Sequence, residues 1–196
     1  MTKVVIVGAG VAGINAATKL VDNNFKGNIV IIDMGKNPYD RLPEEVMTGM
    51  LGAGGWSDGK LTYHTSIGGQ LSKYCGDEKA MELMDQVINN FKRFHPKPEE
   101  VQCSNPVAEP DFIKPYFGLR LFPVWHVGTD YLHEIGKNWY NYLKDNGVEF
   151  YWEWRVKEID FKTRNLTMTS EKYLQMDDDW IFFDKLIFGV GKSGID

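Results

Sequence analysis

The fold follows from one stretch near the start of the chain, Lys3-Val4-Val5-Ile6-Val7-Gly8-Ala9-Gly10-Val11-Ala12-Gly13. A β-branched apolar run leads directly into three glycines with the spacing G-x-G-x-x-G, and a helical apolar pattern follows up to about Val21. A second apolar run over residues 29–32 ends at Asp33, 20 residues after Gly13. This order of strand, glycine turn, helix and acid-terminated strand predicts a dinucleotide-binding βαβ unit.

Each glycine of this turn has a physical role. Gly8 permits the tight turn out of the strand, Gly10 lets a pyrophosphate approach the backbone, and Gly13 lets the helix pack close to the strand. The N-terminus of the helix offers free N–H groups and the positive end of a dipole to phosphates. We therefore expect the pyrophosphate to bind at Gly8, Gly10 and Gly13 together with Ala9, Val11 and Ala12. The alternative is a glycine-rich turn in another kind of α/β protein.

Asp33 is the expected ligand of a ribose, because its carboxylate can accept hydrogen bonds from the two hydroxyls. Met34, the next residue, is expected beside the same group. An ordinary acid at the end of a strand is the alternative interpretation of Asp33.

Composition narrows the functional class. The chain has 196 residues, of which 43% are hydrophobic and 25% charged, as in an ordinary soluble protein, and its net charge of −5 gives no basic surface for nucleic acid. No apolar run reaches the length of a membrane span, and no signal-peptide pattern is present. Cys75 and Cys103 form no CxxC motif, and no histidine lies in a metal-binding pattern. We expect a cytoplasmic protein that binds neither nucleic acid nor membrane, and no metal.

The remaining chain predicts an α/β fold with a parallel sheet, a β-meander and an irregular insertion. Helices are expected over residues 77–94, which His95-Pro96 terminates, and from an N-cap at Thr129 or Asp130 to about Asn146. Alternation along a strand would place Trp152 and Trp154 on one face. The predicted regions are the βαβ unit 1–34, a glycine-rich loop 49–70, a helical and proline-rich insertion 71–126, and a helix, meander and closing strand 127–196, all in one domain 1–196.

This organisation resembles the FAD-binding domain of glutathione-reductase-like flavoproteins, in which the chain leaves the sheet after the second strand and returns through a helix, a meander and a closing strand. Three segments are also similar to motifs of the uncharacterised FAD-dependent dehydrogenase family. Ser57-Asp58-Gly59-Lys60-Leu61-Thr62 matches its SDGKLT signature, while residues 125–132 and 191–196 match two further motifs less closely. Residues 71–124 match no motif of the family.

The resemblance implies FAD as the cofactor and a flavin-dependent oxidoreductase that transfers a hydride between the flavin and an unidentified small-molecule substrate. It also implies further cofactor-binding residues, with Val156 contacting adenine through its backbone. These are Arg41, Ser57, Gly59, Lys60, Leu61, Val156, Gly189 and Gly191. A surface arginine and plain core packing are the alternatives for Arg41 and Val156.

Lys60 and His126 are the candidate catalytic residues. A cation such as Lys60 can stabilise negative charge on a reduced flavin, and a histidine titrates near neutral pH. The alternatives are a solvated lysine and a structural histidine bonded to backbone.

Members of the family are longer than this chain and continue into a substrate region, which is apparently absent here. We therefore expect the chain to hold the ADP half of FAD better than its ring, and a complementary C-terminal polypeptide or a larger assembly to be a partner. Two other functions stay open. One is a non-catalytic nucleotide- or FAD-binding module, or a subunit of a larger assembly, and the other is an NAD(P)-dependent reductase, which shares the glycine motif.

Overall fold

The computed structural model describes residues 1–107, 112, 116–170 and 178–191. The chain divides into two compact units. The first unit comprises Met1–Trp56 and His133–Asp196, and the second unit comprises Ser57–Leu132.

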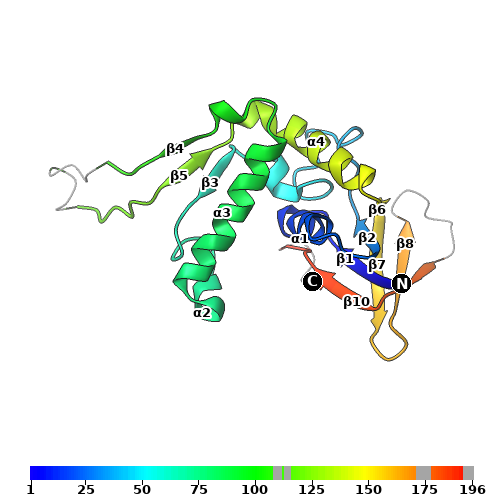
Figure 1. Ribbon diagram of the computed structural model, residues 1–196. Coiled ribbons are helices and arrows are strands. Elements are labelled where there is room, and N and C mark those ends of the chain that lie inside the picture. The colour runs from blue at the N-terminus through cyan, green and yellow to red at the C-terminus, as the bar shows by residue number, and fades with distance from the viewer. Residues whose placement is uncertain (108–111, 113–115, 171–177, 192–196) are drawn as a thin grey trace. The chain divides into compact units, whose positions relative to one another are not determined.

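A four-stranded parallel sheet forms the centre of the first unit (Figure 1). Its strands are β1 (Thr2–Val7), β2 (Gly27–Asp33), β6 (Val148–Trp152) and β10 (Lys185–Phe188), in the order β10-β1-β2-β6. Helix α1 (Val11–Asp22) connects β1 to β2, and β10 returns to pair with β1, so that Val7 lies opposite both Ile32 and Phe188. The predicted βαβ unit, parallel sheet and closing strand are confirmed.

Side chains alternate along each strand, so each face of this sheet packs against its own set of elements. Val5 and Val7 of β1 and Val30 and Ile32 of β2 pack in one buried cluster with residues of an antiparallel meander. The meander consists of β7 (Trp154–Asp160), β8 (Asn165–Ser170) and β9 (Asp179–Phe182). On the other face, the position of a Cβ at Gly13 of α1 lies 3.1 Å from the Ile6 side chain, so the helix packs directly on the strand.

Helix α4 (Leu132–Asp145) is tied to α1 by one buried hydrogen bond. The indole N–H of Trp139 donates to the hydroxyl of Thr18 at 2.7 Å, and that hydroxyl donates to the carbonyl of Ile14 at 2.8 Å. Trp139 and Thr18 are both fully buried. The bond thus satisfies an indole N–H that would otherwise be unpaired in the core.

The prediction that Trp152 and Trp154 share a face is wrong. Glu153 between them has φ = +64°, which ends β6 and interrupts the alternation before β7 begins. Trp152 stacks on Phe150, with ring centroids 5.2 Å apart, whereas Trp154 packs against the buried cluster of the meander.

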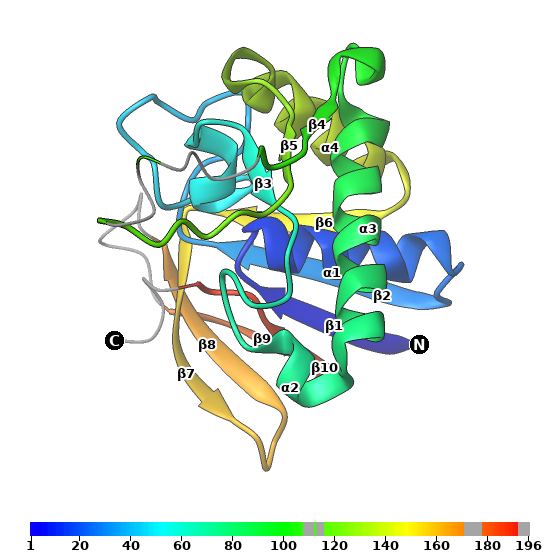
Figure 2. The same cartoon turned by 90° about the vertical axis from the view of Figure 1, so that its left-hand side faces the viewer.

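The second unit is built on a small antiparallel sheet in the order β3-β5-β4. Its strands are β3 (Lys60–Thr62), β4 (Gln102–Ser104) and β5 (Val124–His126). The helices are α2 (Leu71–Cys75) and α3 (Asp77–Phe94), and short 3₁₀ turns are η2 (Pro98–Glu100) and η3 (Thr129–Tyr131). Figure 2 shows α3 as the long helix that follows α2. The predicted helix over residues 77–94 is confirmed.

The N-cap predicted at Thr129 or Asp130 is wrong. Both residues lie inside η3, which Gly128 precedes, and the Thr129 hydroxyl donates to the carbonyl of Asp58 at 3.1 Å. The helix to which the cap was assigned, α4, begins only at Leu132. In the part of the chain that the structure describes, no helix combines the length and apolar character needed to span a bilayer.

Replacing Thr18 by valine tests the buried bond between α1 and α4. Thr18→Val keeps the shape of the side chain but leaves the Trp139 indole N–H without its acceptor, so we expect the free energy of unfolding to fall by about 1–3 kcal/mol. Urea denaturation measures this change. Thr18→Ser is the control, because it retains the hydroxyl, and a valine variant as stable as the serine variant would contradict the role of the bond.

Candidate functional site

Two of the three fingerprint glycines are required by the fold itself. Gly8 has φ = +102°, and a Cβ there would lie 2.5 Å from the carbonyl oxygen of Gly189. A Cβ at Gly13 would lie 2.0 Å from the carbonyl oxygen of Gly8. Both distances are too short for real Cβ atoms, so a side chain at either position would force β1, α1 and the end of β10 apart.

Gly10 differs from the other two. Its φ of −66° and ψ of 176° are open to any residue, and among the described residues a Cβ at this position would come within 4 Å of the carbonyl oxygen of Gly189 alone, at 3.6 Å. That distance is an ordinary van der Waals contact. The described residues therefore give no packing reason for a glycine here, and the bare backbone is a surface that a ligand can approach closely.

The start of α1 is suited to an anion. Gly10 caps the helix without a side-chain hydrogen bond, and the first turn carries no acidic residue. The regular hydrogen bonding of the helix begins with the bond from the Ile14 N–H to the Gly10 carbonyl. The N–H groups of Val11, Ala12 and Gly13 lie before this first bond, as at the start of any α-helix. A phosphate at this end would meet backbone donors and the positive end of the helix dipole.

A second glycine-rich segment runs beside this turn. The Leu51 N–H donates to the carbonyl of Ala9 at 2.8 Å, and a short 3₁₀ turn, η1 (Gly52–Trp56), follows. A Cβ at Gly52 would lie 3.4 Å from the Cα of Gly10. The two glycine segments thus form one backbone surface within the first unit.

Asp33 lies at the end of β2, as predicted, and its carboxylate binds three backbone N–H groups. One oxygen accepts from Ala9 at 2.7 Å, and the other accepts from Gly35 at 2.8 Å and from Gly49 at 2.7 Å. The residue is 9% exposed. Because an ionised carboxylate has about four acceptor positions, roughly one remains for a hydroxyl of a ligand. Met34 follows as a half-buried residue.

Arg41 is not a surface arginine, and that alternative is wrong. Its side chain is buried, and burial lowers its pKa to about 10 although the nearby Asp33 carboxylate opposes the shift. It remains charged at neutral pH. The guanidinium group donates to backbone carbonyls of the loop that follows it, namely those of Glu45 at 3.0 Å, Val46 at 2.9 Å, Gly52 at 2.8 Å and also Met50. Arg41 thus holds the second glycine segment in place.

Val156 combines core packing with an irregular backbone. Its side chain packs against the buried cluster that includes Val7 and Ile32. The pairing of β7 with β8 shifts register between Val156 and Glu158, as at a β-bulge. Because a bulge places an extra residue on one strand, the regular pairing of the ladder is disrupted next to Val156.

The closing turn also lies against the fingerprint. The N–H of Gly189 donates to the carbonyl of Val7 at 2.7 Å, and a Cβ at Gly189 would lie 2.9 Å from the nitrogen of Gly13. Gly191 has φ = +62°, and a Cβ there would meet no atom of the described residues within 4 Å. The structure therefore brings the predicted residues Gly8–Gly13, Asp33 and Gly189 together.

The second unit contains the remaining predicted residues, which are Ser57, Gly59, Lys60, Leu61 and His126. Lys60 of β3 and His126 of β5 are direct partners across the strands. The Lys60 ammonium forms an ion pair with Asp58 at 2.9 Å, and this contact holds the pKa of the Asp58 carboxyl below its usual value. The Nε2 atom of His126 lies 3.0 Å from the hydroxyl of Ser104 on β4.

Sequence reasoning missed Ser104. It lies two residues from Gln102, the partner of His126, and therefore on the same face of the sheet. Only the pairing of β4 with β5 reveals this proximity, since the two segments are separated by the proline-rich region.

The three remaining predicted residues precede or accompany Lys60. Ser57 is exposed, and its hydroxyl accepts from the N–H of Gly59 at 3.3 Å. Gly59 has φ = +70°, and a Cβ there would lie 2.9 Å from the carbonyl carbon of Gly128, so packing requires this glycine. Leu61 is half-buried opposite Trp125.

Comparison with solved structures identifies the fold. The chain aligns with the flavoprotein/dehydrogenase of Cytophaga hutchinsonii at a TM-score of 0.50 and 17% identity, covering 95% of this chain and 39% of that protein. It aligns with BexE, a protein studied for oxidation during BE-7585A biosynthesis, at a TM-score of 0.54 and 15% identity, covering 96% of this chain and 31% of that protein. No protein-family model matches the sequence, and no curated protein does.

These likenesses show a shared fold, the Rossmann-like fold of FAD-binding flavoproteins. The chain spans less than half the length of either protein. The expected fold class is therefore confirmed, while identities of 15–17% leave the chemistry to be argued from the site.

Replacing Asp33 by asparagine tests whether its carboxylate holds the first unit together. The amide keeps one acceptor oxygen, but an NH₂ group replaces the other oxygen. This donor would face a backbone N–H, which is also a donor. We expect Asp33→Asn to lower the free energy of unfolding by about 1–3 kcal/mol, measured by urea denaturation. Asp40→Asn is the control, since Asp40 is exposed and its carboxylate accepts a hydrogen bond from the side chain of Asn37. Equal stability of the two variants would contradict this role of Asp33.

Proposed function

We propose that the first unit binds the ADP half of FAD, and that the chain is the FAD-binding portion of a flavin-dependent oxidoreductase. The observation that carries this proposal is the contrast among the fingerprint glycines. Gly8 and Gly13 are required by packing, whereas among the described residues a Cβ at Gly10 would make an ordinary van der Waals contact, and no side chain caps the start of α1 there. A glycine without a packing role, at an anion-binding helix end, is what a close-lying pyrophosphate needs.

The residues of the first unit take distinct roles in this proposal. The backbone from Gly8 to Gly13 holds the pyrophosphate, and Asp33 accepts one ribose hydroxyl at its remaining position. The backbone next to Val156, where the β7–β8 ladder shifts register, contacts adenine. Arg41 acts through the loop that it holds rather than as a direct ligand, because four of its N–H groups are already bonded to carbonyls.

Bound FAD would supply the hydride chemistry, and the protein would supply position and charge. In the second unit, Lys60 is the chain's own cation for stabilising a reduced flavin. His126 is the group suited to holding a proton, and the Ser104 hydroxyl 3.0 Å from its Nε2 orients the ring. The substrate is an unidentified small molecule, and we propose that a further segment or partner completes its site.

A nucleotide-binding module without catalysis is the second candidate. It is favoured by the observation that the glycine turn and Asp33, which we propose to bind the ADP half, are held together by backbone hydrogen bonds within the first unit. The NAD(P)-dependent alternative shares those contacts, but the likeness in fold to the flavoprotein/dehydrogenase of Cytophaga hutchinsonii over 95% of this chain supports FAD.

Replacing Gly10 by valine separates ligand binding from folding. The backbone at Gly10 accommodates a side chain, so the Gly10→Val variant should fold, while its side chain occupies the expected position of the pyrophosphate. We expect the dissociation constant for FAD, measured by the change in flavin fluorescence, to rise at least tenfold.

Gly118→Val is the matched control. A Cβ at Gly118 would meet no atom of the described residues within 4 Å, and Gly118 lies in the second unit, so this variant should bind FAD as the unaltered chain does. A Gly10→Val protein that bound FAD as tightly as the Gly118→Val protein would overturn the placement of the pyrophosphate.

A further inference from the structure

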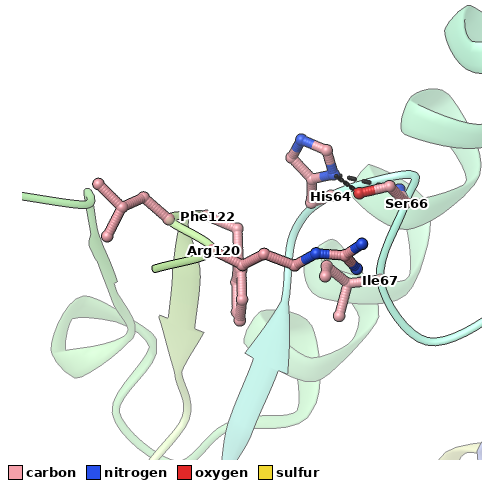
Figure 3. Close-up of a pocket in the computed structure, with 6 residues that line it drawn as sticks. His64, Ser66, Ile67, Arg120 and Phe122 are labelled. Carbon is pink, nitrogen blue, oxygen red and sulfur yellow. Dashed lines mark hydrogen bonds between the residues drawn. The ribbon is translucent and has the colours of Figure 1, made fainter. Parts of the chain in front are cut away.

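The second unit contains a pocket that the proposed FAD site does not use. Its lining comes from two short segments, His64, Ser66 and Ile67 on one side and Arg120, Leu121 and Phe122 on the other (Figure 3). The pocket has a volume of about 240 Å³. All six residues belong to the second unit, and none is part of the glycine turn.

Regular pairing fixes the base of this pocket. Strands β3 and β5 are antiparallel, with Thr62 opposite Val124. One more bond, from the Tyr63 N–H to the carbonyl of Pro123 at 2.9 Å, extends the pairing beyond the strands. The two segments that line the pocket continue from the end of this ladder, so their starting points are held at a defined separation.

The wall formed by residues 64–67 is a locally bonded turn. The N–H of Ser66 donates to Nδ1 of His64 at 3.1 Å, and the Ser66 hydroxyl lies 2.9 Å from the same nitrogen. The Ile67 N–H donates to the carbonyl of His64 at 3.2 Å. These bonds hold the polar atoms of His64 and Ser66 next to the Ile67 side chain.

Arg120 gives the opposite wall its charge. Figure 3 shows its guanidinium group extended toward the side of the pocket where Ile67, Ser66 and His64 lie. The lining contains no carboxylate, and none of the carboxylates among residues 1–107, 112, 116–170 and 178–191 forms an ion pair with Arg120. Among the described residues, the pocket thus offers one permanent positive charge that no carboxylate neutralises.

The remaining lining is apolar. Ile67 and Phe122 are half-buried, and Leu121 is 44% exposed. A guanidinium group binds a carboxylate through two parallel hydrogen bonds, and neighbouring apolar side chains favour a ligand with an apolar body. Because a cavity of about 150 Å³ holds benzene, a pocket of this volume has room for a ring together with a carboxylate.

We infer that this pocket is a binding site for a small organic carboxylate with an apolar body. Arg120 binds the carboxylate, Ile67, Leu121 and Phe122 contact the apolar body, and the His64–Ser66 pair provides polar contacts at the rim. No residue of the pocket belongs to the proposed flavin site, so the proposal for the pocket can be tested without FAD.

The test uses the full chain without added FAD and benzoate as the probe. Amide shifts in two-dimensional nitrogen–proton NMR spectra, followed during titration at constant ionic strength, should change for residues 64–67 and 120–122. Benzamide, which has the same shape but no charge, should bind at least tenfold more weakly. Shifts confined to other residues, or equal binding of benzamide, would overturn the inference.

Variants and a second anion complete the test. Arg120→Met keeps an apolar side chain but removes the charge, and it should raise the dissociation constant for benzoate at least tenfold. Lys73→Met removes another exposed cation of the same unit and should leave that constant unchanged. Inorganic phosphate should compete only weakly. Unaltered benzoate binding by the Arg120→Met protein, or equal affinity for phosphate, would contradict a site for organic carboxylates.

Discussion

The carboxylate of Asp33 joins three segments of the first unit that are distant in sequence. It accepts hydrogen bonds from the N–H groups of Ala9 in the glycine turn, Gly35 after β2 and Gly49 in the following loop. Buried backbone N–H groups need acceptors, and a single ionised group satisfies all three here. The geometry of the proposed nucleotide site therefore depends on this one side chain.

Arg41 complements Asp33 in the same loop. The carboxylate accepts hydrogen bonds from backbone N–H groups, whereas the guanidinium donates hydrogen bonds to backbone carbonyls of residues 45–52. Together the two charges hold a loop with little regular secondary structure, so that Leu51 reaches the carbonyl of Ala9 and Gly52 lies against Gly10. A site built in this way is formed before a ligand arrives, which lowers the cost of ordering on binding.

The sequence allowed the parallel sheet, α1, α3 and the meander to be predicted, because apolar periodicity and glycine spacing are local signals. The positions of Gly8, Gly13 and Asp33 followed from the same motif. The additional role of Asp33 could not be predicted, since two of its three partners, Gly35 and Gly49, are glycines whose N–H groups carry no sequence signal. Arg41 was equally ambiguous, because a buried and an exposed arginine look alike in a sequence.

Other features depend on pairing between distant segments. Glu153, a residue with a left-handed backbone, separates Trp152 from Trp154, and alternation alone did not reveal that break. The Ser104 hydroxyl contacts His126 because β4 pairs with β5. Arg120 lines the same pocket as His64 and Ser66 because β5 pairs with β3. Residues 192–196, which contain most of the third motif similar to the flavoprotein family, lie outside the described residues.

The visible absorption spectrum of the purified chain, with any released chromophore identified by mass, tests the flavin assignment most directly. A site preformed around Gly10 and Asp33 predicts a yellow protein, or one that becomes yellow with added FAD, at one FAD per chain. A colourless chain that takes up no added FAD, or one that binds NAD in its place, would contradict the assignment.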